Sequence, residues 1–226
     1  MGILNHWKII VVAGAVGLAL CALALVFHAR TGDFLSESGP VEMLSAILHL
    51  CSAIGILFLR PFWTWLHLSV VCLLMAEREF EAEVLGPGAA LRLFSEWLDA
   101  HVLHNVWVLA PLYLWVLGSL VLLSLPRWWS GLRAGSLVPP LVFLACAFAG
   151  LAEVASEGAK MLSAGLTEAT HHQLEAFEET GELCFSVGIF AAVLIGLAAD
   201  RFGYRTHDLP DPKDSRRDKA ADERAA

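Results

Sequence analysis

Glutamate and histidine side chains recur at helical spacing in residues 168–182, "EATHHQLEAFEETGE", directly before a long apolar run. At 100° per residue, one set of them falls within a strip about 80° wide on a single helix face. This set is Glu168, His171, Glu175, Glu178 and Glu182. Carboxylates and neutral imidazoles at i, i+3 and i+4 can together hold a divalent metal ion, and polar groups of this kind can also carry protons.

The same residue types stand at the ends of other apolar runs or inside them. Glu42 and His49 share one helix face, with His49 about 10 Å deeper along the helix axis. An ionisable group at membrane depth is costly unless it is paired or lines a wet cavity. We therefore predict one outward-facing cluster that can bind a cation or protons, with a divalent metal ion as its candidate ligand. Its candidate members are Glu42, His49, Glu153, Glu178 and Glu182, with His104, Glu77 and Arg78 nearby.

Other ionisable residues fit simpler roles. Glu168, Glu175 and Glu179 fit a solvated helix face, and His67 fits a hydrogen-bonded packing residue. The single ExxH match, which ends at His171, is expected by chance in a chain of this composition and does not indicate a two-metal site. The sequence also contains no HExxH, GxSxG or Walker motif, so it names no reaction or substrate.

Long apolar runs must provide the elements that position these side chains. The chain has 226 residues, of which 57% are hydrophobic and 17% charged, an apolar share above that of a typical soluble domain. Most of the runs approach the roughly 20 residues that cross the hydrocarbon core as a helix. We predict an all-α, polytopic membrane helix bundle over residues 1–204. Its six transmembrane helices are expected at about 8–28, 41–60, 61–78, 104–125, 137–155 and 178–200.

Some segments of this layout have particular expectations. The third and fifth runs are short, and either can instead be re-entrant. The stretch "GAALRLFSEWLDAHVL" has apolar residues at helical spacing, which predicts a short helix in the outer interface after the third span. Thr170 and Gln173 form a capping-box pattern, so a helix can begin there and continue into the last span. The charged tail, residues 205–226, is expected to be disordered.

The charges sort between the two sides of this topology. Eleven of the fifteen Lys and Arg residues fall on the side of the termini, and four fall on the other side. By the positive-inside rule, both termini and the tail are then cytoplasmic. Sixteen of the twenty-three Asp and Glu residues fall on the opposite, periplasmic side. The sequence therefore predicts an inner-membrane protein with an acidic outer face.

Three short motifs mark the ends of the predicted spans. They are "GPVE" at residues 39–42, "REFE" at 78–81 and "EETGE" at 178–182. In these motifs the chain resembles a set of uncharacterised bacterial six-helix inner-membrane proteins along most of its length. The resemblance implies a fold and a location in the bacterial cytoplasmic membrane, and it implies no established activity.

Three functions remain open on these observations. The first is a cation- or proton-binding membrane protein with a transport or accessory role. The second is a membrane-embedded, metal-dependent enzyme acting on a lipid or quinone, with His49 and Glu178 or Glu182 as ligands and Glu42 or Glu153 as base. The third is a structural partner of a membrane complex or homo-oligomer. The lipid bilayer is the expected environment in each case, and nucleic acid is not an expected partner.

Overall fold

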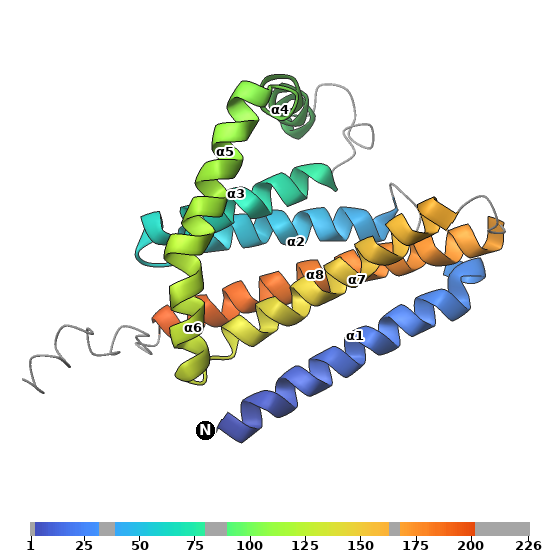
Figure 1. Cartoon of the computed structure of the whole chain (residues 1–226), viewed down its shortest axis with the longest axis horizontal. Coiled ribbons are helices and arrows are strands. Elements are labelled where there is room, and N and C mark those ends of the chain that lie inside the picture. Colours follow the sequence, from blue (N-terminus) through green and yellow to red (C-terminus); the bar gives the residue numbers. More distant parts are fainter. Residues whose placement is uncertain (1–2, 32–38, 80–89, 163–167, 202–226) are drawn as a thin grey trace, which may run out of the picture.

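The computed structural model describes residues 3–31, 39–79, 90–162 and 168–201. Within these ranges the chain is almost entirely helical and has no β-strand (Figure 1), which confirms the predicted all-α class. The predicted tail and the loops around residues 35, 85 and 165 lie outside the described ranges.

The described chain folds into ten consecutive helical segments. They are α1 (Ile3–Thr31), α2 (Pro40–Leu57), α3 (Phe62–Arg78), α4 (Ala90–Leu98), η2 (Asp99–Leu103), α5 (Val106–Ser119), η3 (Leu120–Ser124), α6 (Leu125–Arg133), α7 (Val138–Leu162) and α8 (Glu168–Arg201). The segments η2 and η3 are short π-helical turns. Through η3, the helices α5 and α6 form one continuous helix of 28 residues.

Five helices are long and apolar enough to cross a membrane. The qualifying segments are Lys8–Val26, Pro40–Leu57, Val106–Arg133, Val138–Gly158 and His172–Ala199. The predicted third span is also helical, but α3 has only 17 residues, fewer than the roughly 20 that the hydrocarbon core requires. The count of six spans and the interfacial position of α4 therefore stay predictions.

Local sequence features explain where several helices begin. Pro40 stands in the first turn of α2, where its missing N–H costs no hydrogen bond. Asn105 caps α5, because its side-chain oxygen accepts a hydrogen bond of 3.1 Å from the Trp107 N–H. Helix α8 spans 34 residues without a break, so the predicted continuity of the polar stretch with the apolar run is confirmed. The predicted start at Thr170 is wrong, because the helix already includes Glu168.

Glycines let α7 and α8 pack closely. A Cβ atom at Gly181 would lie 2.5 Å from the Ala152 Cβ, and one at Gly188 would lie 2.7 Å from the Ala145 Cβ. Both distances are shorter than side chains tolerate, so the two backbones approach because no side chain separates them. Helix α8 also packs against α1 and α2, and α2 packs against α3.

The long helix from α5 to α6 departs from the expected layout. The predicted fourth span ends at about residue 125, but the helix continues through Pro126 to Arg133, and the turn lies at residues 134–137. Pro126 is accommodated because it stands in the first turn of α6, directly after the π-helical turn. Gly135, with a φ of 74°, makes the turn.

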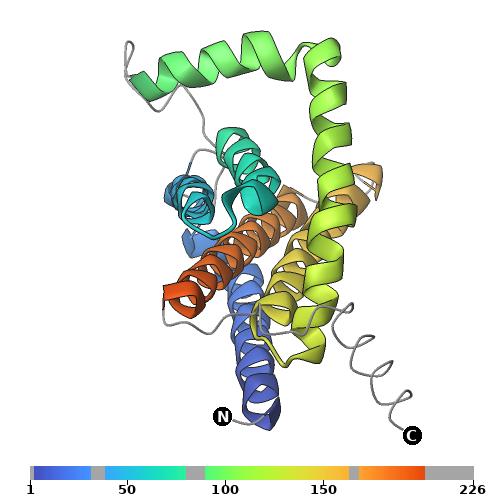
Figure 2. The same cartoon turned by 90° about the vertical axis from the view of Figure 1, so that its left-hand side faces the viewer.

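This long helix also runs steeply across α2, α3, α7 and α8 instead of alongside them (Figures 1 and 2). Transmembrane helices tilt by about 0–40° from the bilayer normal. The long helix and the bundle of α2, α3, α7 and α8 therefore do not share one direction, as the predicted spans would.

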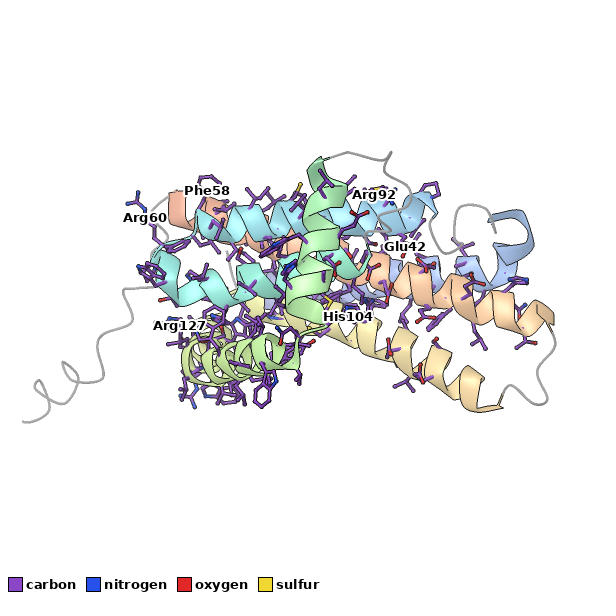
Figure 3. The ribbon with its side chains drawn as sticks, turned by 90° about the horizontal axis from the view of Figure 1, so that it is seen from above. Glu42, Phe58, Arg60, Arg92, His104 and Arg127 are labelled. Atoms are coloured by element: carbon purple, nitrogen blue, oxygen red, sulfur yellow. The ribbon has the colours of Figure 1, made fainter. Side chains whose placement is uncertain are left out.

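The bundle has chemically different ends. Figure 3 shows Glu42 toward one end, and Arg60 and Arg127 toward the other. Between them, an apolar core forms where α2, α3 and α8 meet, around Ile56 and Val193. The largest fully buried side chains are nevertheless polar: His67, Ser45, Ser52, Ser124 and Ser186. Polar groups inside the bundle are thus part of its packing.

Candidate cation site

Three glutamates from two helices converge near the Glu42 end of the bundle. Helix α7 supplies Glu153, and α8 supplies Glu178 and Glu182. One carboxylate oxygen from each lies within 4.8 Å of the others. Oxygen ligands stand about 2.0–2.6 Å from Mg²⁺ or Ca²⁺, so one ion can reach all three side chains after small rotations.

The fold explains this convergence. Glu178 and Glu182 are four residues apart and therefore face the same side of α8. Gly181, between them, brings α8 against Ala152 of α7, the residue before Glu153. The close contact of the two helices thus places the third carboxylate beside the other two.

Arg78 connects this group to α3. Its Nε and Nη2 atoms donate to Glu79 Oε1 over 3.0 Å and 2.8 Å, and Nη2 also donates to Glu182 Oε1. The Arg78 side chain is 54% exposed, whereas that of Glu79 is 5% exposed. Because water reaches the guanidinium, this ion pair contributes modestly to stability, but it links the end of α3 to α8 at the site.

Glu179 is buried, with 8% of its surface exposed. The interpretation of Glu179 as part of a solvated face was therefore wrong. A helical wheel of α8 alone could not reveal this burial, because the neighbouring helices supply it. The carboxylates that repel Glu179 come from α2, from the end of α3 and from α8 itself: Glu42, Glu79, Glu178 and Glu182.

We call Glu42, Glu79, Glu153, Glu178, Glu179 and Glu182 the acidic cluster. Arg78 offsets part of its negative charge. Carboxylates that are partly withdrawn from water and repel one another are stabilised by a bound cation or by protons. The cluster is therefore suited to holding positive charge.

His49 lies next to the acidic cluster but does not belong to the group of three carboxylates. Its Nε2 atom is 2.9 Å from Ser186 Oγ, and that hydroxyl donates over 2.8 Å to the backbone carbonyl of Glu182. The His49 ring also packs on Phe185, with 5.2 Å between ring centroids. His49 thus contacts the segment of α8 that carries Glu182.

The remaining predicted residues are placed as follows. Glu42 lies in the first turn of α2 and Glu77 in the last turn of α3, both half-buried. His104 is exposed in the turn before α5, at the α4–α5 corner that stands away from α2 and α8 (Figure 1). The side chains of Glu168 and His171 lie outside the described residues. His67 hydrogen-bonds through Nε2 to Ser124 Oγ over 2.8 Å, which fits a packing role.

Two residues that contribute to the candidate site, Glu79 and Ser186, were not predicted from the sequence. Glu79 is part of the "REFE" motif, but that motif alone does not show that its side chain turns toward α8. Ser186 is four residues after Glu182 and so continues the glutamate stripe one turn farther. Extending the stripe into the apolar run would have identified it.

An apolar groove of about 720 Å³ lies between α1, α7 and α8. Its lining includes Gly17, Phe148 and Val187, with Thr180 near one end. Among the described residues, no carboxylate lines the groove, so it is not an extension of the acidic cluster there.

No protein-family model, curated protein or solved structure matches the chain.

Proposed function

We propose that the protein binds a divalent cation through Glu153, Glu178 and Glu182 and acts in cation transport or in an accessory role to it. The observation that carries the proposal is the approach of three carboxylate oxygens, from two helices, to within 4.8 Å of one another. All of these donors are oxygens, which suit Mg²⁺, Ca²⁺ or Mn²⁺ better than ions that prefer nitrogen or sulfur ligands.

The surrounding charges support a cation at this point. Glu42 and Glu79 add negative charge beside the three donors, and the carboxyl group of Glu179 is buried next to them. Arg78 forms ion pairs with Glu79 and Glu182, but about half of its side chain is exposed to water. A divalent ion would relieve the repulsion among these groups, and it would do so most strongly where the carboxylates are least hydrated.

We further propose that the bundle crosses a bacterial cytoplasmic membrane six times, with both termini inside and the acidic cluster outside. The opposite placement of Glu42 and Arg60 supports this orientation (Figure 3). The exposed Leu93 and Trp97 support an interfacial position for α4, which lies at a steep angle to α5 (Figure 2). This topology requires the long helix from α5 to α6 to lie closer to the direction of the bundle than it does in Figures 1 and 2.

Metal analysis of purified protein tests the cation site. Glu182→Gln removes the charge but keeps the shape, so we expect the folded variant to lose most of its bound cation, with affinity weakened by at least about tenfold. Glu175→Gln is the matched control. Glu175 lies on the same stripe but farther out, is half exposed and faces His172 at 3.3 Å, and its variant should retain the cation. Wild-type protein without a saturable divalent site, or equal effects of both substitutions, would refute the proposal.

A further inference from the structure

Two buried polar atoms on one face of α2 lack a hydrogen-bond partner among the described residues. They are Ser45 Oγ and His49 Nδ1. The two residues are only 1% and 2% exposed. Buried polar groups in folded proteins are almost always hydrogen-bonded to protein or to ordered water, because desolvation without a partner is costly. The pair therefore marks a place where a small polar ligand is required.

The hydrogen bonds of Ser186 determine whether His49 Nδ1 is a hydrogen-bond donor or an acceptor. Ser186 has one hydroxyl hydrogen, and it donates that hydrogen to the Glu182 carbonyl over 2.8 Å. The 2.9 Å contact with His49 is then a hydrogen bond from Nε2–H to Ser186 Oγ. In the neutral ring, Nδ1 is consequently a bare acceptor. It needs a hydrogen-bond donor.

The spacing of Ser45 and His49 suits a single water molecule. They are four residues apart on α2, so their Cβ atoms stand about 5–6 Å from each other on one helix face. A water between them can donate to Nδ1 and exchange a second hydrogen bond with the Ser45 hydroxyl. Two or more polar partners are what a buried water requires.

We propose that Ser45 and His49 bind a water molecule, and that this water, His49 and Ser186 form a hydrogen-bonded network that positions Glu182. The network ends on the Glu182 backbone carbonyl, so it fixes the turn of α8 that presents this carboxylate. The charged groups around it are Glu42, one turn before Ser45, together with Glu182 and Arg78. His49 and Ser45 are thus positioning residues. The water site itself does not depend on the proposed cation site, but its effect on cation binding rests on that proposal.

Nitrogen-15 NMR of histidine-labelled protein in lipid nanodiscs tests the water site without added metal. His49 is assigned from the signals that disappear in His49→Gln. We expect a protonated Nε2, an unprotonated Nδ1 that accepts a hydrogen bond, and magnetisation transfer from water to this ring. Ser45→Ala should abolish the transfer, whereas Ser156→Ala, which changes a buried serine on α7, should keep it.

Each other result overturns the proposal. A protonated Nδ1 would reverse the tautomer, and absence of transfer from water would mean a dry site. A shift of the Nδ1 signal to that of a metal-bound nitrogen after addition of diamagnetic Zn²⁺ would make His49 a ligand. The Ser45→Ala variant should also bind Mg²⁺ about tenfold more weakly. Unchanged Mg²⁺ affinity would remove the positioning role but leave the cation site standing, and loss of Mg²⁺ binding in wild type would refute only the cation site.

Discussion

The Arg78 side chain both links two helices and balances negative charge at the site. It donates to Glu79 at the end of its own helix and to Glu182 across the interface with α8. Glu182 is therefore shared between an ion pair and the group of three carboxylates. A cation bound there would compete with Arg78 for the same oxygens.

Replacing Arg78 should reveal the competition between Arg78 and a bound cation for the carboxylate oxygens. We expect Arg78→Gln to lower the free energy of unfolding by about 1 kcal/mol at low salt, because the guanidinium is half exposed and its interactions are screened as salt rises. Divalent cations should restore more of the thermal stability of the variant than of wild type, since they replace the lost positive charge. Thermal unfolding with and without Mg²⁺ measures both effects.

The matched control for Arg78 is Arg92→Gln. Arg92 pairs with Glu96 over 2.7 Å on the exposed face of α4, and an i,i+4 pair of this kind contributes only about 0.3–0.5 kcal/mol. No Mg²⁺-dependent recovery is expected for it. Equal behaviour of the two variants would show that Arg78 is an ordinary surface charge.

The sequence was sufficient to select Glu178 and Glu182, because their spacing on one helix reveals a common face. It was insufficient for Glu79 and Glu179. Their surroundings depend on which helices pack against α8, and a single helical wheel contains no information about neighbours. His49 shows the same limit, since its partner Ser186 is 137 residues away in the chain.

Among the elements, the contact of α7 with α8 positions the site. Gly181 and Gly188 lie two turns apart on α8 and face Ala152 and Ala145. Small residues at such spacing let membrane helices approach closely, where packing substitutes for a hydrophobic driving force. The cation site lies at one end of this contact.

Alanine at Gly181 should separate the two helices. A glycine-to-alanine change in a helix interior normally stabilises by about 0.5–1 kcal/mol, but the new Cβ would stand 2.5 Å from the Ala152 Cβ and 3.2 Å from the Phe148 carbonyl oxygen. We expect a net loss of about 1–3 kcal/mol and weaker Mg²⁺ binding, measured by thermal unfolding and calorimetric titration.

Gly150→Ala is the control for this substitution. It lies on α7, and nothing stands within 4 Å of a Cβ atom built there. This variant should be as stable as wild type or slightly more stable, with unchanged Mg²⁺ affinity. If Gly181→Ala behaves in the same way, the close contact does not position Glu153.

The helices themselves were predictable from the apolar runs, but the direction of the long helix from α5 to α6 was not. Exposed apolar residues such as Val106, Trp107, Leu114 and Leu122 occur all along it. A helix that is apolar on every side shows no preferred face, so its sequence does not specify what it packs against. Its position depends on contacts with distant parts of the chain, such as the hydrogen bond between His67 and Ser124.

At the scale of the whole molecule, charge asymmetry is the strongest indication of orientation. In the proposed six-span topology, Lys and Arg concentrate on the side of the termini, and Asp and Glu on the other. The separation of Glu42 from Arg60 along the bundle agrees with this division (Figure 3). The acidic cluster should therefore meet cations on the outer side of the membrane.

Reporter fusions check this topology. A reporter placed after Lys213 should be cytoplasmic, and one inserted near Gly88 should be periplasmic, because the positive-inside rule orients the chain by its Lys and Arg residues. A third reporter, inserted after Ser136, separates the models further. Cytoplasmic activity there means that the helix from α5 to α6 crosses the membrane after the external loop, whereas external activity means that it lies along the outer face.

Locating a bound ion tests the cation site most directly. Mn²⁺ is a hard, oxygen-preferring ion whose anomalous scattering identifies its position in crystals of the full-length protein. The account predicts a Mn²⁺ peak between the carboxylates of Glu153, Glu178 and Glu182, and its disappearance in Glu182→Gln. Saturating Mn²⁺ without a peak between these three side chains, or with a peak at His49 or His104 instead, would contradict it.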